Sequence, residues 1–211
     1  MTNKNVKVGI VEDNSLLRLS LGTSLGQENM EIVFSVSTAL EALELIETAK
    51  IDVLIADLHL GETINGIDVS ILWQKSNPDL GVVYLTSYDD PRLISGGKSP
   101  VLAENHVYLT KSSISEISEL TKAIYSSLEK KGRTETKRTG PLAKLTDVQM
   151  ETLSLLALGH SNKEIARIRG ITEESVAISL NRISKALGVP SHMDRNQRVH
   201  LARVVLGGRS D

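Results

Sequence analysis

Short apolar runs alternate with longer segments of helical periodicity along the first 128 residues. Five of the runs are rich in β-branched and aliphatic residues and are bounded by turn residues, which is typical of buried strands. These runs cover residues 6–11, 32–36, 51–56, 80–85 and 107–110. Apolar residues three and four apart predict helices over residues 14–27, 38–50, 67–73 and 114–128. Strands that alternate with helices in this way favour an α/β fold, with a flavodoxin-like five-stranded parallel sheet.

The stretch between the fourth and fifth strands departs from this alternation. Gly96, Gly97 and Pro100 interrupt it, so any helix here is weak. The run Gly97-Lys98-Ser99 invites comparison with a phosphate-binding loop. However, Arg92 occupies the place of that motif's first glycine, and no strand leads directly into the run. We interpret it as an ordinary loop.

The second half of the chain shows helix start and stop signals at short intervals. Thr146 with Gln149, and Ser161 with Glu164, are capping-box patterns, and Thr172 is a further N-cap. The predicted helices cover residues 146–158, 161–170, 172–187 and 194–206. Two short helices joined by a tight turn, with the second helix longer, predict a small all-α helix-turn-helix domain.

Charge separates the two halves. Residues 1–125 hold nine basic and seventeen acidic residues, whereas residues 144–211 hold ten basic and seven acidic ones. The stretch between them is polar, basic and broken by glycine and proline, which is typical of a flexible linker. We therefore expect three parts: a first domain over residues 1–128, a linker over residues 129–143 and a second domain over residues 144–211 that faces a polyanion.

Three acids follow the first and third predicted strands. Glu12 and Asp13 come directly after residues 6–11, and Asp57 comes directly after residues 51–56. Because the carboxyl ends of parallel strands meet at one edge of a sheet, these carboxylates should lie together and repel one another. A few hard oxygen ligands suit Mg²⁺, with water and a phosphoryl oxygen in the remaining positions.

With Thr86 after the fourth strand and Lys111 after the fifth, residues 5–128 resemble the receiver domain of bacterial two-component response regulators. The resemblance implies that Asp57 is the phosphoacceptor for a partner histidine kinase. It also implies that His59 supplies a backbone carbonyl to the metal. The remaining residues implied for phosphoryl binding and switching are Thr86, Ser87, Tyr108 and Lys111.

Three features differ from the usual receiver pattern. Leu60-Gly61 stands where Met-Pro is common, Gly66 arrives about one residue late, and Ser112 replaces the proline that usually follows the lysine. The interrupted stretch after Pro91 replaces the fourth helix.

Residues 144–206 resemble the LuxR-type DNA-binding domain that follows receivers in the FixJ/NarL class. The most specific match is the run Ser161-Asn162-Lys163-Glu164-Ile165-Ala166. The third helix lacks the usual basic pair on its groove-facing side and has Ala177, Ser179 and Leu180 there instead. The candidates for phosphate and base contacts are Lys163, Arg167, Arg169, Ser175, Ser179, Asn181, Arg182 and Lys185. Low positive charge predicts weak non-specific binding, so we expect a homodimer on promoter DNA.

Composition narrows the alternatives. The chain has no cysteine, which excludes disulfides and thiolate sites, and no apolar stretch of membrane-span length, so we expect a cytoplasmic protein without a membrane partner. The leading hypothesis is a phosphorylated transcriptional regulator rather than an enzyme. One alternative is a DNA-binding dimer that does not depend on phosphorylation. Another is a phosphatase of the haloacid dehalogenase kind, but His59 stands where such enzymes place a second aspartate.

Overall fold

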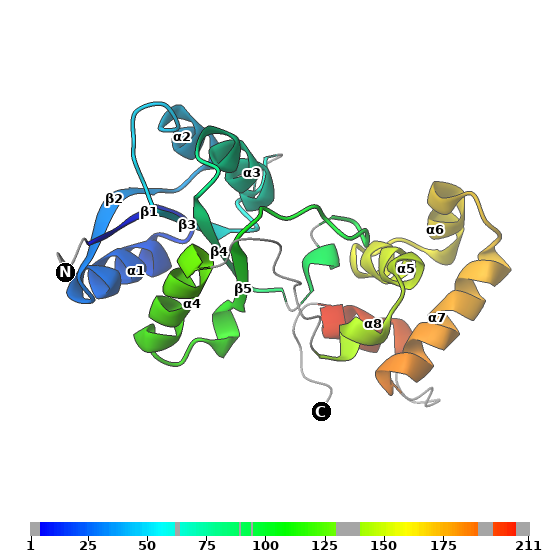
Figure 1. Cartoon of the computed structure of the whole chain (residues 1–211). Helices are drawn as coiled ribbons and strands as arrows, with labels where there is room; N and C mark the ends of the chain where they lie inside the picture. The colour runs from blue at the N-terminus through cyan, green and yellow to red at the C-terminus, as the bar shows by residue number, and fades with distance from the viewer. Residues whose placement is uncertain are drawn as a thin grey trace. The chain divides into compact units, whose positions relative to one another are not determined.

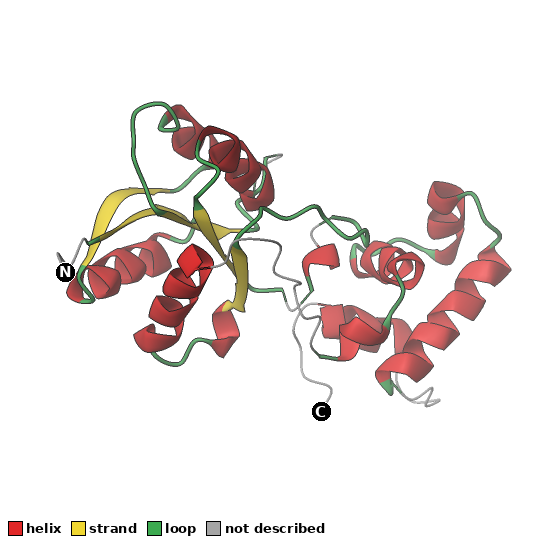
Figure 2. Cartoon of the chain, viewed as in Figure 1, coloured by secondary structure: helices red, strands yellow, loops and turns green. Residues whose placement is uncertain are grey.

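The computed structural model describes residues 5–61, 64–88, 90–93, 95–129, 140–189 and 196–205. The chain divides into two compact units, a sheet-containing unit and a helical unit (Figures 1 and 2). The sheet unit comprises Met1–Ser87 and Val101–Thr136, and the helical unit comprises Tyr88–Pro100 and Lys137–Asp211. The stretch Tyr88–Pro100, which the sequence places inside the first domain, thus belongs to the helical unit in the structure.

The sheet unit contains five parallel strands in the order β2-β1-β3-β4-β5. The strands are β1 (Val6–Val11), β2 (Met30–Val36), β3 (Val53–Asp57), β4 (Gly81–Thr86) and β5 (His106–Thr110). This is the flavodoxin-like order, and it confirms the predicted fold class. All five carboxyl ends lie at the same edge of the sheet.

Helices cover both faces of this sheet (Figure 1). They are α1 (Ser15–Gln27), α2 (Ala39–Glu44), α3 (Gly66–Ser76) and α4 (Ile117–Glu129). Leu25 of α1 and Leu120 of α4 pack with strand residues such as Ile55 in one buried cluster. On the other face, the indole N–H of Trp73 donates to the carbonyl of Ala42, which ties α3 to α2. Burial on both faces explains why β3 and β4 are largely apolar up to their last residues, Asp57 and Thr86.

Two predicted helices have different bounds in the structure. The second helix ends at Glu44 rather than residue 50, and the chain continues in turns that mix three-residue bonds, from Ile46 N–H to Leu43 and from Thr48 N–H to Leu45, with a four-residue bond from Ala49 N–H to Leu45. The last helix of the sheet unit begins at Ile117 rather than residue 114 and follows a short 3₁₀ turn, η2 (Lys111–Ser113).

In the second of its two segments, the first described element of the helical unit is a 3₁₀ turn, η3 (Pro141–Lys144). Its helices are α5 (Asp147–Ala157), α6 (Asn162–Arg169), α7 (Glu173–Leu187) and α8 (Gln197–Val205). The capping boxes at Thr146 and Ser161 are both formed, and Gly170 and Gly188 end α6 and α7 in the left-handed conformation. These observations confirm the predicted helices. The predicted start of the last helix, residue 194, lies outside the described residues.

One apolar core holds the helical unit together. Leu153 of α5, Ile165 of α6, Val176 of α7 and Leu201 of α8 are fully buried in it. Leu142 of η3 joins the same core, so the polar linker does not extend to residue 143 as the sequence suggested. Residues 130–139 of that linker lie outside the described part of the chain. Among the helices that the structure describes, none has both the length and the apolar character needed to cross a membrane.

Candidate functional site

Three charged side chains meet at the carboxyl edge of the sheet. The Lys111 ammonium, which follows β5, lies 2.7 Å from Asp57 Oδ2 at the end of β3 and 2.8 Å from Glu12 Oε2 just after β1. Glu12 and Asp57 are buried, whereas the Lys111 side chain keeps about a fifth of its surface exposed. The edge therefore holds two acids and one neutralising cation, as the order of the strands predicts.

Burial and pairing shift two of these groups. Burial raises the pKa of Glu12; the nearby charge of Asp57 adds to this, while hydrogen bonding to Lys111 opposes it. Burial alone would lower the pKa of Lys111, but its hydrogen bonds to Asp57 and Glu12 and their charges outweigh that effect, so its pKa is raised. Lys111 is thus held in its charged form between the two acids.

Asp13 completes a cluster of three acids. One carboxylate oxygen from each of Glu12, Asp13 and Asp57 lies within 4.8 Å of the other two. Asp13 is exposed, whereas both Glu12 and Asp57 already face the lysine. Three carboxylates that converge from adjacent strands, with one open to solvent, fit the hard oxygen ligands that Mg²⁺ requires.

Backbone contacts hold the acids in place, and one of them was not predicted. Arg18 of α1 donates through Nη1 to the carbonyl oxygens of Glu12, at 2.6 Å, and Asp13, at 3.3 Å. Asn14 caps α1 and donates its own N–H to Glu12 Oε1 at 3.2 Å. The guanidinium of Arg18 therefore positions the acidic pair. The only sequence signal for this role is its place one turn into the helix that follows the acids.

The loop after β3 fits tightly around Asp57. The N–H of His59 donates to Asp57 Oδ1 at 3.1 Å, which orients the carboxylate. A side chain at Gly66 would place its Cβ only 2.0 Å from the carbonyl oxygen of Asp57. Only glycine lets α3 begin this close to the site, which gives Gly66 a steric reason for its position. The carbonyl of His59 as a metal ligand stays a prediction.

The expected switch residues lie on β4 and β5. Thr86 is buried at the end of β4, and Ser87 is exposed just beyond it. Tyr108 pairs in register with Tyr84, and side chains two apart on a strand share a face, so Tyr108 and Thr86 project from the same face of the sheet. Tyr108 is partly buried. Two of the predicted switch residues therefore share one face of the sheet, near the edge that holds Asp57 and Lys111.

In the helical unit, α7 presents an exposed stripe. Ser175, Ile178, Asn181, Arg182 and Lys185 are exposed and recur at three- and four-residue spacing along one side of the helix. The opposite side, with Val176 and Leu180, is buried in the core. Two cations, one amide and one hydroxyl on one free side of a helix form a surface suited to phosphates and base edges.

The remaining candidates for DNA contact differ in their surroundings: some face solvent, and Arg169 is bonded within the fold. Lys163 and Arg167 on α6 are exposed, and Ser179 on α7 is partly buried. Arg169 is engaged within the fold: its Nε lies 3.2 Å from Glu151 Oε2, and its Nη1 donates to the Thr152 hydroxyl. Its side chain is only 10 % exposed. The sequence offered no means of separating Arg169 from its neighbours, because the partner acid lies on another helix.

The two units match two family models. The model of the response regulator receiver domain matches residues 8–125, and that of the bacterial regulatory proteins of the luxR family matches residues 143–202. A parallel sheet with an acidic edge, followed by a helix-turn-helix unit, defines a regulator with one domain for input and one for DNA. The chain belongs to the response regulator family, in the class that joins a receiver to a LuxR-type DNA-binding domain.

Individual relatives cover nearly the whole chain. The response regulator protein VraR of Staphylococcus saprophyticus is 29% identical over an alignment of 204 residues, and the match covers 92% of this chain and 94% of VraR. VraR of Staphylococcus aureus is 28% identical over 201 residues, with the same coverage.

Solved structures show the same fold. A DNA complex of the two-component response regulator RcsB has a TM-score of 0.59 at 18% identity and covers 96% of this chain and 100% of its own. RcsB of Salmonella enterica bound to the promoter rprA has a TM-score of 0.52 at 21% identity, with coverage of 97% and 99%.

Proposed function

We propose that a partner histidine kinase phosphorylates this chain on Asp57 and that the phosphoryl group controls its binding to promoter DNA. The observation that carries the proposal is the meeting of Lys111, Glu12 and Asp57 at one edge of the sheet. Lys111 bonds to both acids, and a third acid lies beside them. When a phosphoryl group adds negative charge at this edge, the ammonium of Lys111 can neutralise part of it.

The chemistry follows from the groups present. A carboxylate oxygen of Asp57 attacks phosphorus, the P–N bond of the phosphohistidine breaks, and the kinase histidine leaves with the electron pair of that bond. Lys111 stabilises the charge on the phosphoryl oxygens, and the Thr86 hydroxyl donates to one of them. Asp13 and Asp57, with the His59 carbonyl, would hold Mg²⁺, and a bound Mg²⁺ would supply further charge neutralisation. The chain acts as a stoichiometric acceptor rather than as an enzyme that turns over.

DNA binding is assigned to the exposed side of α7, inserted in the major groove, with α6 beside it. Asn181 and Ser175 read bases, while Arg182, Lys185, Lys163 and Arg167 contact phosphates, and Ser179 lies at the margin of this surface. RcsB is described in complex with DNA and as dimers on DNA, which supports the same arrangement here. Few cations on this surface mean that tight binding requires a homodimer. Such a regulator works in the cytoplasm.

The decisive test is a search for an acyl phosphate on Asp57. The full chain is incubated with Mg²⁺ and a small phosphodonor and analysed by mass spectrometry before and after hydroxylamine. We expect one phosphoryl group per chain, located on Asp57 and removed by hydroxylamine. A chain that gains no phosphoryl group, or gains it elsewhere, would leave the phosphorylation-independent DNA-binding dimer as the better hypothesis.

A further inference from the structure

Residues 88–100 lie between two strands of the sheet unit in sequence but fold as part of the helical unit. Among their described residues the structure shows one 3₁₀ turn, η1 (Pro91–Leu93), where receivers usually have a helix. Leu93 packs against the apolar core that contains Leu142 and Leu153. The stretch is therefore attached to the DNA-binding unit by apolar contact as well as by the polar contacts that follow.

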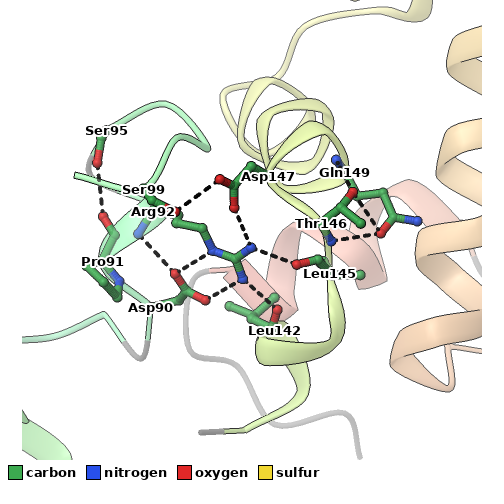
Figure 3. Close-up of polar contacts among 10 residues, drawn as sticks. All are labelled: Asp90, Pro91, Arg92, Ser95, Ser99, Leu142, Leu145, Thr146, Asp147 and Gln149. Carbon is green, nitrogen blue, oxygen red and sulfur yellow. Dashed lines mark hydrogen bonds and ion pairs between the residues drawn. The ribbon is translucent and has the colours of Figure 1, made fainter. Parts of the chain in front are cut away.

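Arg92 is the centre of those polar contacts (Figure 3). Its side chain is fully buried, and Asp90 accepts from it twice, through Oδ1 from Nε at 2.9 Å and through Oδ2 from Nη2 at 2.7 Å. Nη1 donates to the carbonyl of Leu145 at 2.7 Å and to Asp147 Oδ1 at 3.1 Å, while Nη2 donates to the carbonyl of Leu142 at 2.9 Å. One guanidinium thus holds the carbonyl of Leu142 in η3, the carbonyl of Leu145 at the C-cap of η3, and the first residue of α5.

Such a buried cation is costly unless its hydrogen bonds are satisfied. Hydrogen bonds to Asp90 raise the pKa of Arg92, burial opposes this, and Asp147 adds to the rise. The planar fork of five donors suits this set of acceptors, and the single ammonium of a lysine would not. Ser99 adds a bond to the other oxygen of Asp147, at 3.0 Å, from the far end of the stretch. The contact is therefore specific in shape and charge.

Gly97 allows a close approach to α5. A Cβ at this position would lie 2.1 Å from the backbone nitrogen and 2.2 Å from the Cα of Glu151. Gly97 also has a φ of +91°, which a side chain would strain. Its neighbour Gly96 has a φ of +62° but nothing within 4 Å of a built Cβ. The two glycines share a left-handed backbone, and only Gly97 lies against the helix.

Both ends of the stretch are held within the sheet unit. Before it, Thr86 is buried at the end of β4. After it, the N–H of Ala103 donates to the hydroxyl of Tyr84 at 3.0 Å, and the N–H of Glu104 donates to Gln74 Oε1 at 2.7 Å. Only three residues separate Thr86 from Asp90. Because this connection is short, a displacement of Thr86 is transmitted to Asp90.

We propose that residues 88–100 are an intramolecular ligand of the DNA-binding unit, and that phosphorylation of Asp57 releases them. The regulatory half of this proposal rests on the proposed function. Bound to η3 and α5, the stretch adds two short covalent connections to the linker and restricts the orientations of the DNA-binding unit. In a dimer, two DNA-binding units must reach half-sites one helical turn of DNA apart. Restricted orientations of each unit oppose this arrangement and so weaken DNA binding. When Thr86 moves toward a phosphoryl group on Asp57, it displaces Asp90 and Arg92 from their contacts with η3 and α5. The phosphorylated site and the bound stretch therefore stabilise two different states of the chain.

The test compares Gly97→Ala with its matched control Gly96→Ala in the full chain. Hydrogen exchange without phosphodonor comes first: in Gly97→Ala the amides of residues 88–100 and of the start of α5 should exchange at least about tenfold faster, while Gly96→Ala stays near wild type. DNA affinity comes second: phosphorylation should tighten wild-type binding by about fivefold or more, and unphosphorylated Gly97→Ala should already bind like the phosphorylated wild type.

Each outcome decides one part. Equal exchange in the two variants would overturn the bound stretch itself. Faster exchange in Gly97→Ala, with wild-type DNA affinity and an intact response to phosphorylation, would overturn its inhibitory role. A wild-type chain that takes no phosphoryl group would refute the proposed function, and the exchange measurement would still decide whether the stretch is bound. If Gly97→Ala does not fold, Asp147→Asn, which keeps the side-chain shape but removes the charge facing Arg92, replaces it in both measurements.

Discussion

The ammonium of Lys111 lies 2.7 Å from Asp57 Oδ2, although β4 lies between β3, which ends at Asp57, and β5, which ends one residue before Lys111. The lysine side chain therefore passes over the end of β4, next to the position of Thr86. A phosphoryl group on Asp57 would meet the lysine and the threonine hydroxyl without any change in the order of the strands. This relationship makes Asp57 the first target for mutation.

Asp57→Asn should abolish phosphorylation by small phosphodonors, because the amide is a poor nucleophile and a weaker ligand for a cation. The measurement is the mass of the full chain after incubation with phosphodonor and Mg²⁺. Asp79→Asn, an exposed acid in a turn, is the matched control and should accept a phosphoryl group like the wild type. Labelling that survives in Asp57→Asn would show that another residue is the acceptor.

Lys111→Met should make stability more sensitive to pH. Burial already raises the pKa of Glu12, so the folded state binds this proton more tightly than the unfolded state, and the contribution of Glu12 to stability falls as pH rises from 4.5 through that raised pKa. Without the ammonium, the pKa of Glu12 should rise further and the loss should be steeper. Near neutral pH we expect a loss of roughly 1–3 kcal/mol, reduced by partial exposure of the site.

The measurement for this variant is urea denaturation of the full chain at several pH values. Lys75→Met removes an exposed cation from α3 and serves as the control. The pKa of Lys111 is itself raised, so in the wild type its contribution is present below pH 10.5 and is lost as pH rises through that higher value. If Lys111→Met and Lys75→Met share one pH profile, Lys111 does not neutralise Glu12.

Arg182→Ala should weaken binding to all DNA sequences alike and lower the slope of log affinity against log salt by about 1, because a phosphate contact is lost. Binding would be measured by fluorescence anisotropy at several salt concentrations. Lys122→Ala, which removes an exposed cation from α4 in the sheet unit, should leave both affinity and slope unchanged. Equal effects of the two changes would argue against α7 as the DNA-contact helix.

Arg169→Ala should lower the free energy of unfolding rather than weaken DNA binding directly. Its guanidinium joins α6 to Glu151 and Thr152 of α5, and hydrogen bonds to a charged group contribute about 1.5–3 kcal/mol. Urea denaturation should show this loss, whereas Arg182→Ala should unfold like the wild type. Arg169→Ala with wild-type stability and weakened DNA binding would instead return Arg169 to the set of DNA contacts.

The sheet and its acidic edge could be predicted because each strand carries its own signal. A buried parallel strand reads as an apolar run, and the residue after it marks the carboxyl edge. Asp57 and Lys111 could therefore be brought together from sequence alone. The helix caps at Thr146 and Ser161 were equally local signals, since each box joins residues three apart.

What could not be predicted depends on partners distant in sequence. No residue near Arg92 in the sequence indicates that its acceptors lie fifty or more residues away, at Leu142, Leu145 and Asp147. The glycines between the fourth and fifth strands correctly predicted that the described residues there form no regular helix, but they did not reveal the packing role of Gly97. They indicated a loop, but Gly97 serves a close approach to α5 rather than flexibility.

The last prediction concerns the connection between the units. Several Gly-Ser repeats inserted directly before Gly140 lengthen the linker without altering η3, which begins at Pro141. In the wild type, phosphorylation-dependent DNA binding should weaken only modestly, because the effective concentration of a tethered unit falls slowly with tether length. In Gly97→Ala the same insertion should weaken DNA binding more than in the wild type, because the linker is then the main restraint on the DNA-binding unit. An insertion of equal length in the exposed turn at Asp79 is the control for nonspecific damage. Complete loss of the phosphorylation response in the lengthened wild type, with unphosphorylated affinity unchanged, would show that a rigid linker carries the signal.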